Sequence, residues 1–275
     1  MPNSACALLF SGGTDSTCAA ALAAESFSEI HLLTFSEHAT RYSPVPTARV
    51  RELQAAFTKN RFQQVILSND RVLRYLCYHG YLRSVLQFGF YNLATPGLSS
   101  LSWHLLTIHY CLQHRIKVVQ DGLTRELMHF PGHMDFFVAK LKCLYAEHDL
   151  RYENPVREWP TPYDQQFLDR LLVDYRGVPP AKPGSPTGTT TGDYLHKLGL
   201  SPAKNIKGTR LDHLTQHDCY PFVLYNILCF WLMENLFGFE SFEEGLKRFF
   251  ETKFQLARVL LEKKRHSKLF ELVEP

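Results

Sequence analysis

The sequence lacks several features that would point to particular classes of protein. Its 275 residues carry a formal charge of +3, so the composition gives no argument for a nucleic-acid or strongly acidic partner. The seven cysteines are dispersed, and no two of them form a C-x-x-C pair. An odd, scattered set of cysteines favours a reducing compartment over a disulfide framework.

Long apolar runs are also missing. The start, MPNSACALLF, has no basic residue before its short apolar stretch, which makes it a poor signal peptide. The longest apolar stretch, Tyr220–Phe237, is interrupted by Asn226, Glu234 and Asn235, so it predicts a core or subunit-contact helix rather than a membrane span. We therefore expect a cytoplasmic protein without a membrane partner, in which this apolar helix would allow a homodimer.

Two alternating kinds of segment fill the first two-thirds of the chain. Short apolar or β-branched runs predict five strands: Cys6–Phe10, Ile30–Phe35, Gln64–Leu67, Ile116–Gln120 and Arg151–Val156. Helical patterns separate and follow them: Asp15–Ala24, Ala48–Asn60, two within Val72–His114, Asp135–Glu147 and Asp164–Tyr175. This alternation indicates an α/β fold, a Rossmann-like, doubly wound parallel sheet of five strands with helices on both faces.

The composition changes after this region. Gly177–Gly192 reads GVPPAKPGSPTGTTTG, which predicts a loop or lid. A short helix near Tyr194–Leu198 and two longer ones, Phe222–Leu236 and Phe242–Lys264, are expected beyond it. We therefore expect an α/β domain over residues 1–180, a Pro-, Gly- and Thr-rich loop over 181–192 and a helical C-terminal part over 193–275.

A glycine turn lies between the first predicted strand and the helix after it. Ligands bind beyond the carboxyl ends of parallel strands, and a helix N-terminus there offers free N–H groups to an anion. The turn has neither a Walker lysine nor the G-x-G-x-x-G pattern, so it is an anion cradle of another design. A turn merely capped by the acid remains the alternative. The residues concerned are Ser11, Gly12, Gly13, Thr14, Asp15 and Ser16.

This SGGTDS stretch resembles the SGGxDS signature of the PP-loop ATP pyrophosphatases. The resemblance implies that the loop holds the pyrophosphate end of ATP, which is cleaved between its α and β phosphates. A substrate oxygen is adenylated, and an amine or sulfur nucleophile then displaces AMP. It also implies ATP and Mg²⁺ as cofactors, with Asp15 and Ser16 at the catalytic centre and Asp15 and Glu126 as magnesium ligands.

Later segments resemble the 7-cyano-7-deazaguanine synthases within that family. HLLTFSEHATRY is similar to the end of their second strand, which would place Thr34, Phe35 and Ser36 at the adenosine. His38 and Arg41 would then face the phosphates or the carboxylate being activated. Ser36 departs from the pattern, because those enzymes carry an acid there. The segment VVQDGLTRELMHFPGHMDFF resembles their fourth-strand region and adds three candidates: Gly122 against the nucleotide, Glu126 as the acid and Arg125 as a phosphate contact or an ordinary surface arginine.

The C-terminal third departs most from those synthases, which build a zinc site from four cysteines. Only Cys219 and Cys229 remain in this region, so no zinc site is expected. The segment LDHLTQHDCYP is interpreted as a polar loop near the substrate. Mixed metal ligation by His213, His217 and Cys219, or a nucleophilic Cys219, stays open.

The leading hypothesis is an ATP-dependent carbon–nitrogen ligase of the kind used in queuosine biosynthesis. It would adenylate a carboxylate or carbonyl oxygen of a deazapurine-like acid, or of a modified macromolecule, and replace that oxygen with nitrogen. One alternative is a tRNA sulfurtransferase, which would need a cysteine pair and a basic surface. Another is an inactive ATP-binding subunit that docks a partner through the apolar helix.

Overall fold

Five parallel strands form a single sheet in the computed structural model, as the sequence predicted. The structure describes residues 5–37, 44–125, 130–160, 162, 190–215, 220–262 and 270. The strands are β1 (Ala5–Leu9), β2 (Glu29–Ser36), β3 (Arg61–Ser68), β4 (Val118–Asp121) and β5 (Arg151–Glu153). Their order is β3-β2-β1-β4-β5, and every neighbouring pair is parallel. All five carboxyl ends therefore lie at one edge.

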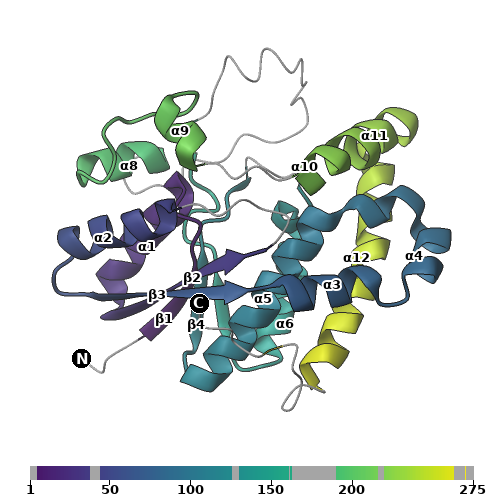
Figure 1. The fold of residues 1–275 in the computed structure, drawn as a ribbon, viewed down its shortest axis with the longest axis horizontal. Helices are drawn as coiled ribbons and strands as arrows, with labels where there is room; N and C mark the ends of the chain where they lie inside the picture. Colours follow the sequence, from purple (N-terminus) through teal and green to yellow (C-terminus); the bar gives the residue numbers. More distant parts are fainter. Residues whose placement is uncertain are drawn as a thin grey trace.

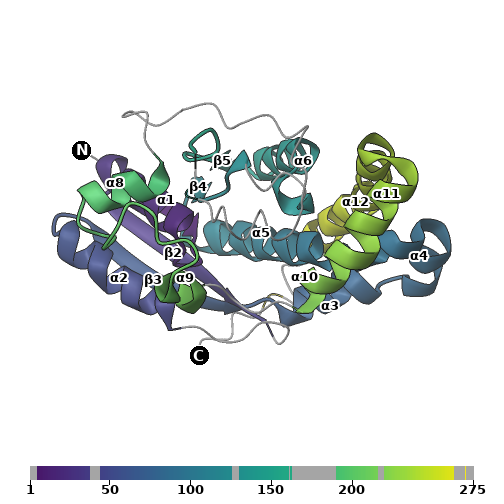
Figure 2. The same ribbon diagram turned by 90° about the horizontal axis from the view of Figure 1, so that it is seen from above.

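Helices cover both faces of the sheet, which confirms the doubly wound architecture (Figures 1 and 2). One face carries α1 (Thr14–Ser26), α2 (Val45–Ala56) and α8 (Thr191–Lys197). The other face carries α3 (Asp70–Tyr78), α5 (Thr95–His114), α6 (Asp135–Ala146) and α12 (Phe239–Glu262). Each face of the sheet is thus covered in part by a helix from the C-terminal part of the chain, α8 on one face and α12 on the other.

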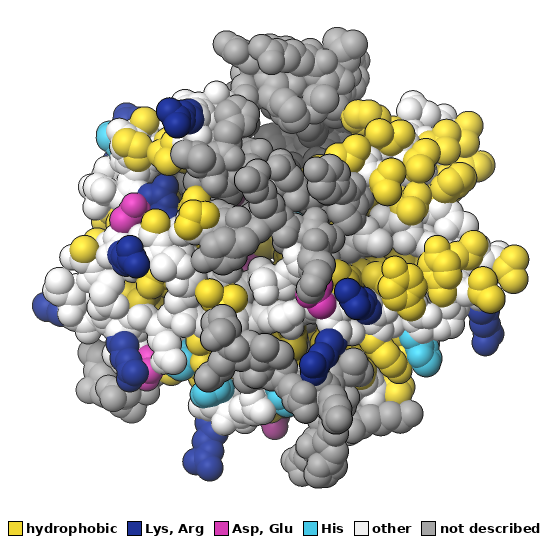
Figure 3. Space-filling model, in the orientation of Figure 1, with side chains coloured by type: hydrophobic (Ala, Val, Ile, Leu, Met, Phe, Trp, Pro, Cys, Tyr) yellow, Lys and Arg dark blue, Asp and Glu magenta, His cyan; other side chains and the backbone are white. Residues whose placement is uncertain are grey.

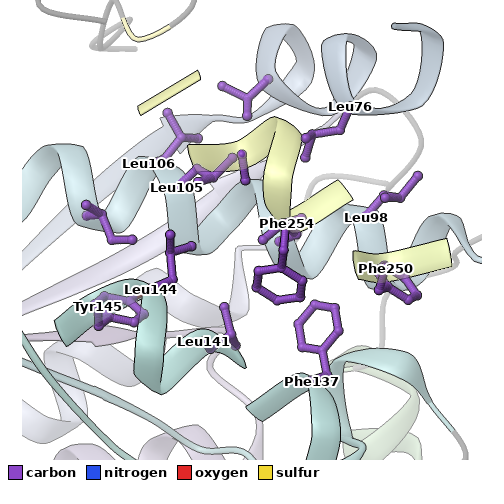
Figure 4. Close-up of a cluster of buried hydrophobic side chains, with 14 of the residues drawn as sticks. Leu76, Leu98, Leu105, Leu106, Phe137, Leu141, Leu144, Tyr145, Phe250 and Phe254 are labelled. Carbon is purple, nitrogen blue, oxygen red and sulfur yellow. The ribbon is translucent and has the colours of Figure 1, made fainter. Parts of the chain in front are cut away.

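Alternation along the strands sends side chains into two separate cores. Cys6 and Leu8 of β1 are fully buried under α1, whereas Ala7 between them faces the opposite core. The opposite core is the larger one, and Figure 4 shows Leu105 of α5, Phe137 of α6 and Phe254 of α12 meeting in it. Burial on both faces explains why the central strands read as continuous apolar runs.

The sequence predicted two long helices within Val72–His114, and this number of helices was wrong. Three helices occupy this stretch, because α4 (Tyr81–Phe88) is separated from its neighbours at both ends. Gly80 and Gly89 have φ angles of +65° and +52°, which an ordinary residue rarely adopts, and the chain turns there. The 3₁₀ helix η1 (Gly89–Leu93) then leads into α5.

The C-terminal part is helical, as expected. The apolar segment predicted as one helix, Phe222–Leu236, continues through α10 (Tyr220–Leu224), the π-helix η4 (Tyr225–Trp231) and α11 (Leu232–Phe237). The short α9 spans Arg210–Thr215, and the 3₁₀ turn η3 spans Pro131–His133 before α6. The predicted helix Asp164–Tyr175 lies outside the described residues. In the described part of the chain, no helix is both long and apolar enough to cross a bilayer.

Candidate functional site

The glycine turn joins β1 to α1 at the carboxyl edge of the central strand, next to β2 and β4. Gly12 has a φ of +77°, and a side chain on it would place Cβ 2.8 Å from the Pro46 Cα at the start of α2. Only glycine satisfies both the left-handed backbone and this close approach. The backbone of the turn at Gly12 therefore packs directly against the start of α2.

The first turn of α1 presents backbone N–H groups without a side-chain cap. Gly13 is the N-cap residue, and its extended backbone makes no capping hydrogen bond through a side chain. The Ser11 hydroxyl lies 3.1 Å from that of Ser16 and accepts the Gly13 N–H at 3.4 Å. The N–H groups of the first helical turn have no acceptors within their own helix. This geometry suits an anion.

The loop after β4 closes the other side of this turn. A Cβ atom on Gly122 would lie 2.4 Å from both the Ser16 nitrogen and the Ser16 Cα, and 2.7 Å from the Asp15 carbonyl carbon. The neighbouring atoms belong to the helix backbone, so they cannot rotate away as the tip of a side chain could. The glycine that the resemblance would place against a nucleotide thus has the first turn of α1 as its direct neighbour.

Asp15 is partly buried, and a residue from the distant α8 binds its carboxylate. Thr191 donates its hydroxyl to the Asp15 Oδ1 at 2.6 Å. Burial raises the pKa of Asp15 to about 6, while the Thr191 hydrogen bond and the charge of Lys207 oppose that rise. Lys207 itself pairs with Asp212 at 3.2 Å. Sequence reasoning missed both Thr191 and Lys207.

Thr191 lies inside the segment that the sequence predicted as a loop. The structure begins α8 there, because Thr190 and Asp193 form a reciprocal capping box at 3.1 Å in each direction. The pattern T-x-x-D before an apolar run was the available signal. Residues 163–189, which include most of the predicted loop, lie outside the described part of the chain.

The carboxyl end of β2 carries the three residues expected at an adenosine. The Thr34 hydroxyl donates to the Phe10 carbonyl at 3.0 Å, and the Phe35 ring stacks on Trp103 of α5 at 5.9 Å. The Ser36 carbonyl accepts the N–H of Asn69 at 3.1 Å. These side chains and groups thus line the end of the strand, with Phe35 turned toward α5.

An acid that the sequence comparison overlooked follows directly. Glu37 is buried and accepts hydrogen bonds from the Asn69 amide at 2.7 Å and from the Ser99 hydroxyl at 3.0 Å. The synthases that the segment HLLTFSEHATRY resembles carry their acid where Ser36 stands, one residue earlier. A shift of one position moves a strand residue to the opposite face, so the motif alone could not have identified it.

Asp121, at the end of β4, organises the neighbouring strand. Its carboxylate accepts hydrogen bonds from the Tyr152 hydroxyl, from the Asn154 amide at 2.8 Å and from the Leu123 N–H at 3.1 Å. Burial raises the pKa of Asp121, and these three donors oppose the rise. Its place beside Gly122 makes it a support for the loop that closes the turn.

Asp121→Ala is expected to lower the free energy of unfolding by about 2–4 kcal/mol, because it leaves buried donors of Tyr152 and Asn154 without an acceptor. Asp121→Asn keeps an acceptor oxygen and should lose less than half as much. Urea unfolding followed by circular dichroism measures both variants. Equal losses in the two variants would contradict the role of the hydrogen bonds.

Arg125, a candidate phosphate contact, is engaged with carboxylates instead. It donates to Asp135 at 2.8 Å and to Glu158 at 3.3 Å. Arg157 donates to the same Asp135 at 2.6 Å and to the His133 carbonyl at 3.0 Å. The structure thus places Arg125 in an ion-pair network between β4 and α6.

Several predicted site residues lie outside the described part of the chain: His38, Arg41, Glu126, His217, Cys219 and the side chain of His213. Their roles remain predictions. Among the residues that the structure describes, no three histidine, cysteine, aspartate or glutamate side chains lie close enough to hold a metal ion together. Of the two magnesium ligands that the resemblance implies, Asp15 and Glu126, the structure describes only Asp15.

Comparison of the sequence with protein-family models and with curated proteins finds no match. Among solved structures, the fold is similar to the crystal structure of a predicted subunit of tRNA methyltransferase from Methanocaldococcus jannaschii, which is 15% identical. The similarity covers 73% of this chain and 91% of that chain, with a TM-score of 0.40. A likeness at this level carries no argument about function, which has to come from the site itself.

Proposed function

We propose that this chain binds ATP with magnesium at the turn between β1 and α1 and uses it to activate an oxygen of an acid for replacement by nitrogen. One observation carries the proposal. The uncapped first turn of α1 lies between two glycines, Gly12 and Gly122, whose neighbours leave no room for a side chain. A cradle of backbone N–H groups at the carboxyl edge of a parallel sheet favours phosphate.

The residues of the cradle divide the work between donors and an acid. The N–H groups of Thr14, Asp15 and Ser16 would bind the phosphate oxygens, with the Ser11 and Ser16 hydroxyls as further donors. The Asp15 carboxylate would bind Mg²⁺, since hard cations prefer carboxylate oxygens and few protein ligands suffice for magnesium when phosphates supply others. Magnesium would offset the charge on the phosphates.

Lys207 fits the place of the lysine that this turn lacks. Its charge acts on Asp15, and its ammonium group is partly exposed, so it can reach an anion beside that carboxylate. A nearby positive charge stabilises the leaving pyrophosphate by electrostatic attraction. Such electrostatic stabilisation is usually the largest single contribution to the rate enhancement of an enzyme. Thr191 would keep the Asp15 carboxylate oriented.

In the proposed reaction a carboxylate oxygen of the substrate attacks the α phosphorus of ATP, and pyrophosphate leaves. An amine then attacks the activated carbonyl carbon, loses a proton, and displaces AMP to form a carbon–nitrogen bond. The resemblance of HLLTFSEHATRY and of the Gly122 region to the 7-cyano-7-deazaguanine synthases supports a deazapurine-like acid as the substrate.

Nitrogen is favoured over sulfur as the incoming atom. A sulfurtransferase needs a cysteine with an accessible, low-pKa thiol near the turn. The two described cysteines nearest in sequence, Cys6 and Cys18, are fully buried, and burial raises the pKa of Cys6 to about 12. Neither thiol suits persulfide chemistry.

The direct test is calorimetric titration of the purified protein with ATP and Mg²⁺, followed by a pyrophosphate-release assay. The assay would contain ammonium and a set of deazapurine carboxylic acids. We expect magnesium-dependent ATP binding at one site and pyrophosphate release that requires an acid. An absence of ATP binding would refute the proposal, whereas binding without release on any acid would favour an inactive nucleotide-binding subunit.

Lys207→Met is expected to weaken ATP binding by about tenfold, because one charge-assisted contact to a phosphate contributes roughly 1.5–3 kcal/mol and part of it is lost to solvent. Lys204→Met is the matched control, since Lys204 lies three residues earlier and is exposed. Titration calorimetry on both variants compares the dissociation constants. Equal weakening by the two changes would indicate a general charge effect rather than a contact.

A further inference from the structure

The surface at the end of the molecule that carries α4 and α11 exposes many apolar side chains (Figures 1 and 2). Helix α4, η1 and the end of α3 expose side chains of which Leu86 is 90% and Leu82 79% exposed. The segment from α10 through the start of α12 exposes others, with Leu236 at 62% and Phe237 at 59%. The full set, here called the apolar face, is Tyr78, Tyr81, Leu82, Val85, Leu86, Phe90, Val223, Leu224, Ile227, Trp231, Leu236, Phe237 and Phe239.

The two parts of the apolar face are joined through α12. The Tyr91 ring of η1 lies 6.2 Å from Phe242 of α12, and the Phe88 ring of α4 lies 5.5 Å from Phe249. Figures 1 and 2 show α4 and α11 at the same end of the molecule. Figure 3 shows hydrophobic side chains gathered over both helices. The exposed apolar side chains therefore gather in two neighbouring groups at one end of the molecule rather than as scattered single residues.

The apolar face is larger than an ordinary protein surface carries. Its six aromatic side chains alone leave roughly 400–700 Å² in solvent, at about 150–250 Å² for each complete ring. The largest apolar patch on a typical monomer covers about 300–600 Å². With the aliphatic side chains added, the face approaches the roughly 800 Å² that each partner buries in a standard interface.

The charges around the apolar face are divided by sign. Residues 71–90, on the α4 side, contain three arginines and no acid. Residues 232–244, on the α11 side, contain four glutamates and no lysine or arginine, and Lys247, farther along α12, pairs with Glu243 at 3.5 Å. Arg74 and Arg83 are exposed on the first side, as are Glu240 and Glu244 on the second. An acidic half argues against an anionic membrane, which favours surfaces that are basic throughout.

We propose that the apolar face binds a second copy of this chain in a two-fold symmetric dimer. In such a dimer each patch meets its own copy in the reverse direction, so the α4 side of one protomer lies against the α11 side of the other. The arginines of each protomer then lie opposite the glutamates of the other, once in each half of the interface. The apolar side chains between them are removed from water. The surface is complementary to itself in both charge and character.

Light scattering after size-exclusion chromatography tests the dimer with the whole chain. We expect the wild-type protein at twice the monomer mass at micromolar concentration, and the variant Leu82→Glu/Leu86→Glu at the monomer mass. Leu112→Glu is the control, because Leu112 is 41% exposed on α5, outside the apolar face, and should leave the dimer intact. Thermal unfolding of each variant verifies that it folds. A monomeric wild type, or a dimer that survives the double change, would overturn the proposal.

A charge-reversal experiment tests the symmetry separately. Arg74→Glu/Arg83→Glu and Glu240→Arg/Glu244→Arg should each weaken self-association by at least about a hundredfold, because like charges then face each other twice. Mixing the two variants should restore dimers that contain one protomer of each, since opposite charges meet again at both positions. Native mass spectrometry distinguishes these mixed dimers by mass. Separate monomers in the mixture would overturn the two-fold arrangement.

Discussion

Asp15→Asn is expected to remove the dependence of ATP binding on magnesium while leaving the fold intact. The wild-type carboxylate offers a charged oxygen to the metal ion, and an amide oxygen binds Mg²⁺ far more weakly. Asparagine keeps the acceptor that Thr191 uses, so α8 should stay in place. Titration calorimetry with ATP, with and without Mg²⁺, should show at least about a hundredfold effect of the metal on the wild type and almost none on the variant. An unchanged magnesium dependence would remove Asp15 from the metal site.

The same substitution should also change the stability of the protein without nucleotide. The pKa of Asp15 is raised to about 6 in the folded state, from about 3.9 in an unfolded chain. The folded state therefore holds more protons between these values, and the free energy of unfolding falls as the pH rises through them. Above pH 6 the ionised carboxylate destabilises the fold by about 1–2 kcal/mol, since part of its contact with water remains.

Asp15→Asn should consequently stabilise the protein at pH 7.5 and have little effect at pH 4. The melting temperatures of the wild type and the variant, measured across this range, provide the test. Magnesium-dependent ATP binding of the wild type should weaken as the pH falls below 6, because protonation of Asp15 removes the charged ligand. A stability difference that does not vary with pH would mean that Asp15 titrates normally.

Gly122→Ala is expected to abolish nucleotide binding and to lower the free energy of unfolding by about 2–4 kcal/mol. The added Cβ would lie 2.4 Å from backbone atoms of Ser16, so either the loop after β4 or the first turn of α1 must move. Either movement turns the N–H groups away from a common anion. Asp121, which is tied to Tyr152 and Asn154, resists movement of the loop.

Gly13→Ala provides the contrast for that experiment. Gly13 has an ordinary φ of −70°, and its added Cβ would meet only the Ser11 hydroxyl, at 3.4 Å. We expect this variant to keep the wild-type melting temperature within about 2 °C, corresponding to less than about 0.5 kcal/mol. Differential scanning calorimetry compares the two variants. Similar melting temperatures for both would show that the contact between Gly122 and α1 is looser than the structure indicates.

The sequence predicted the sheet and its central turn because both depend on short stretches of chain. Apolar runs such as Cys6–Phe10 are recognisable wherever a strand is buried on both faces, and the turn follows one of them directly. The two glycines of the cradle could be identified for the same reason. At each of the two positions the backbone packs so closely against a neighbouring segment that only a residue without a side chain fits.

Residues brought to the site by tertiary packing could not be predicted in this way. Thr191 reaches Asp15 only because α8 packs on α1, and no periodicity in the sequence encodes that contact. Lys207 depends on the same packing. Glu37 was missed for a different reason, since a motif comparison assigns positions one by one and a shift of one residue escapes it.

The apolar face shows a further limit of sequence patterns. Residues such as Leu82 and Leu86 have the spacing of an apolar helix face, and the pattern was interpreted as part of one of two long helices within Val72–His114. Spacing reveals that a helix has an apolar side but not what covers that side. Here the side is turned to solvent in the single chain.

The bond between Thr191 and Asp15 has a consequence for the newly made protein. It joins residues 176 positions apart, so the turn emerges from the ribosome long before its last contact can form. A nascent chain that has reached β5 possesses the glycine cradle yet lacks the threonine that orients its acid. If the turn binds ATP as proposed, tight binding should therefore begin only after α8 has been translated and has docked.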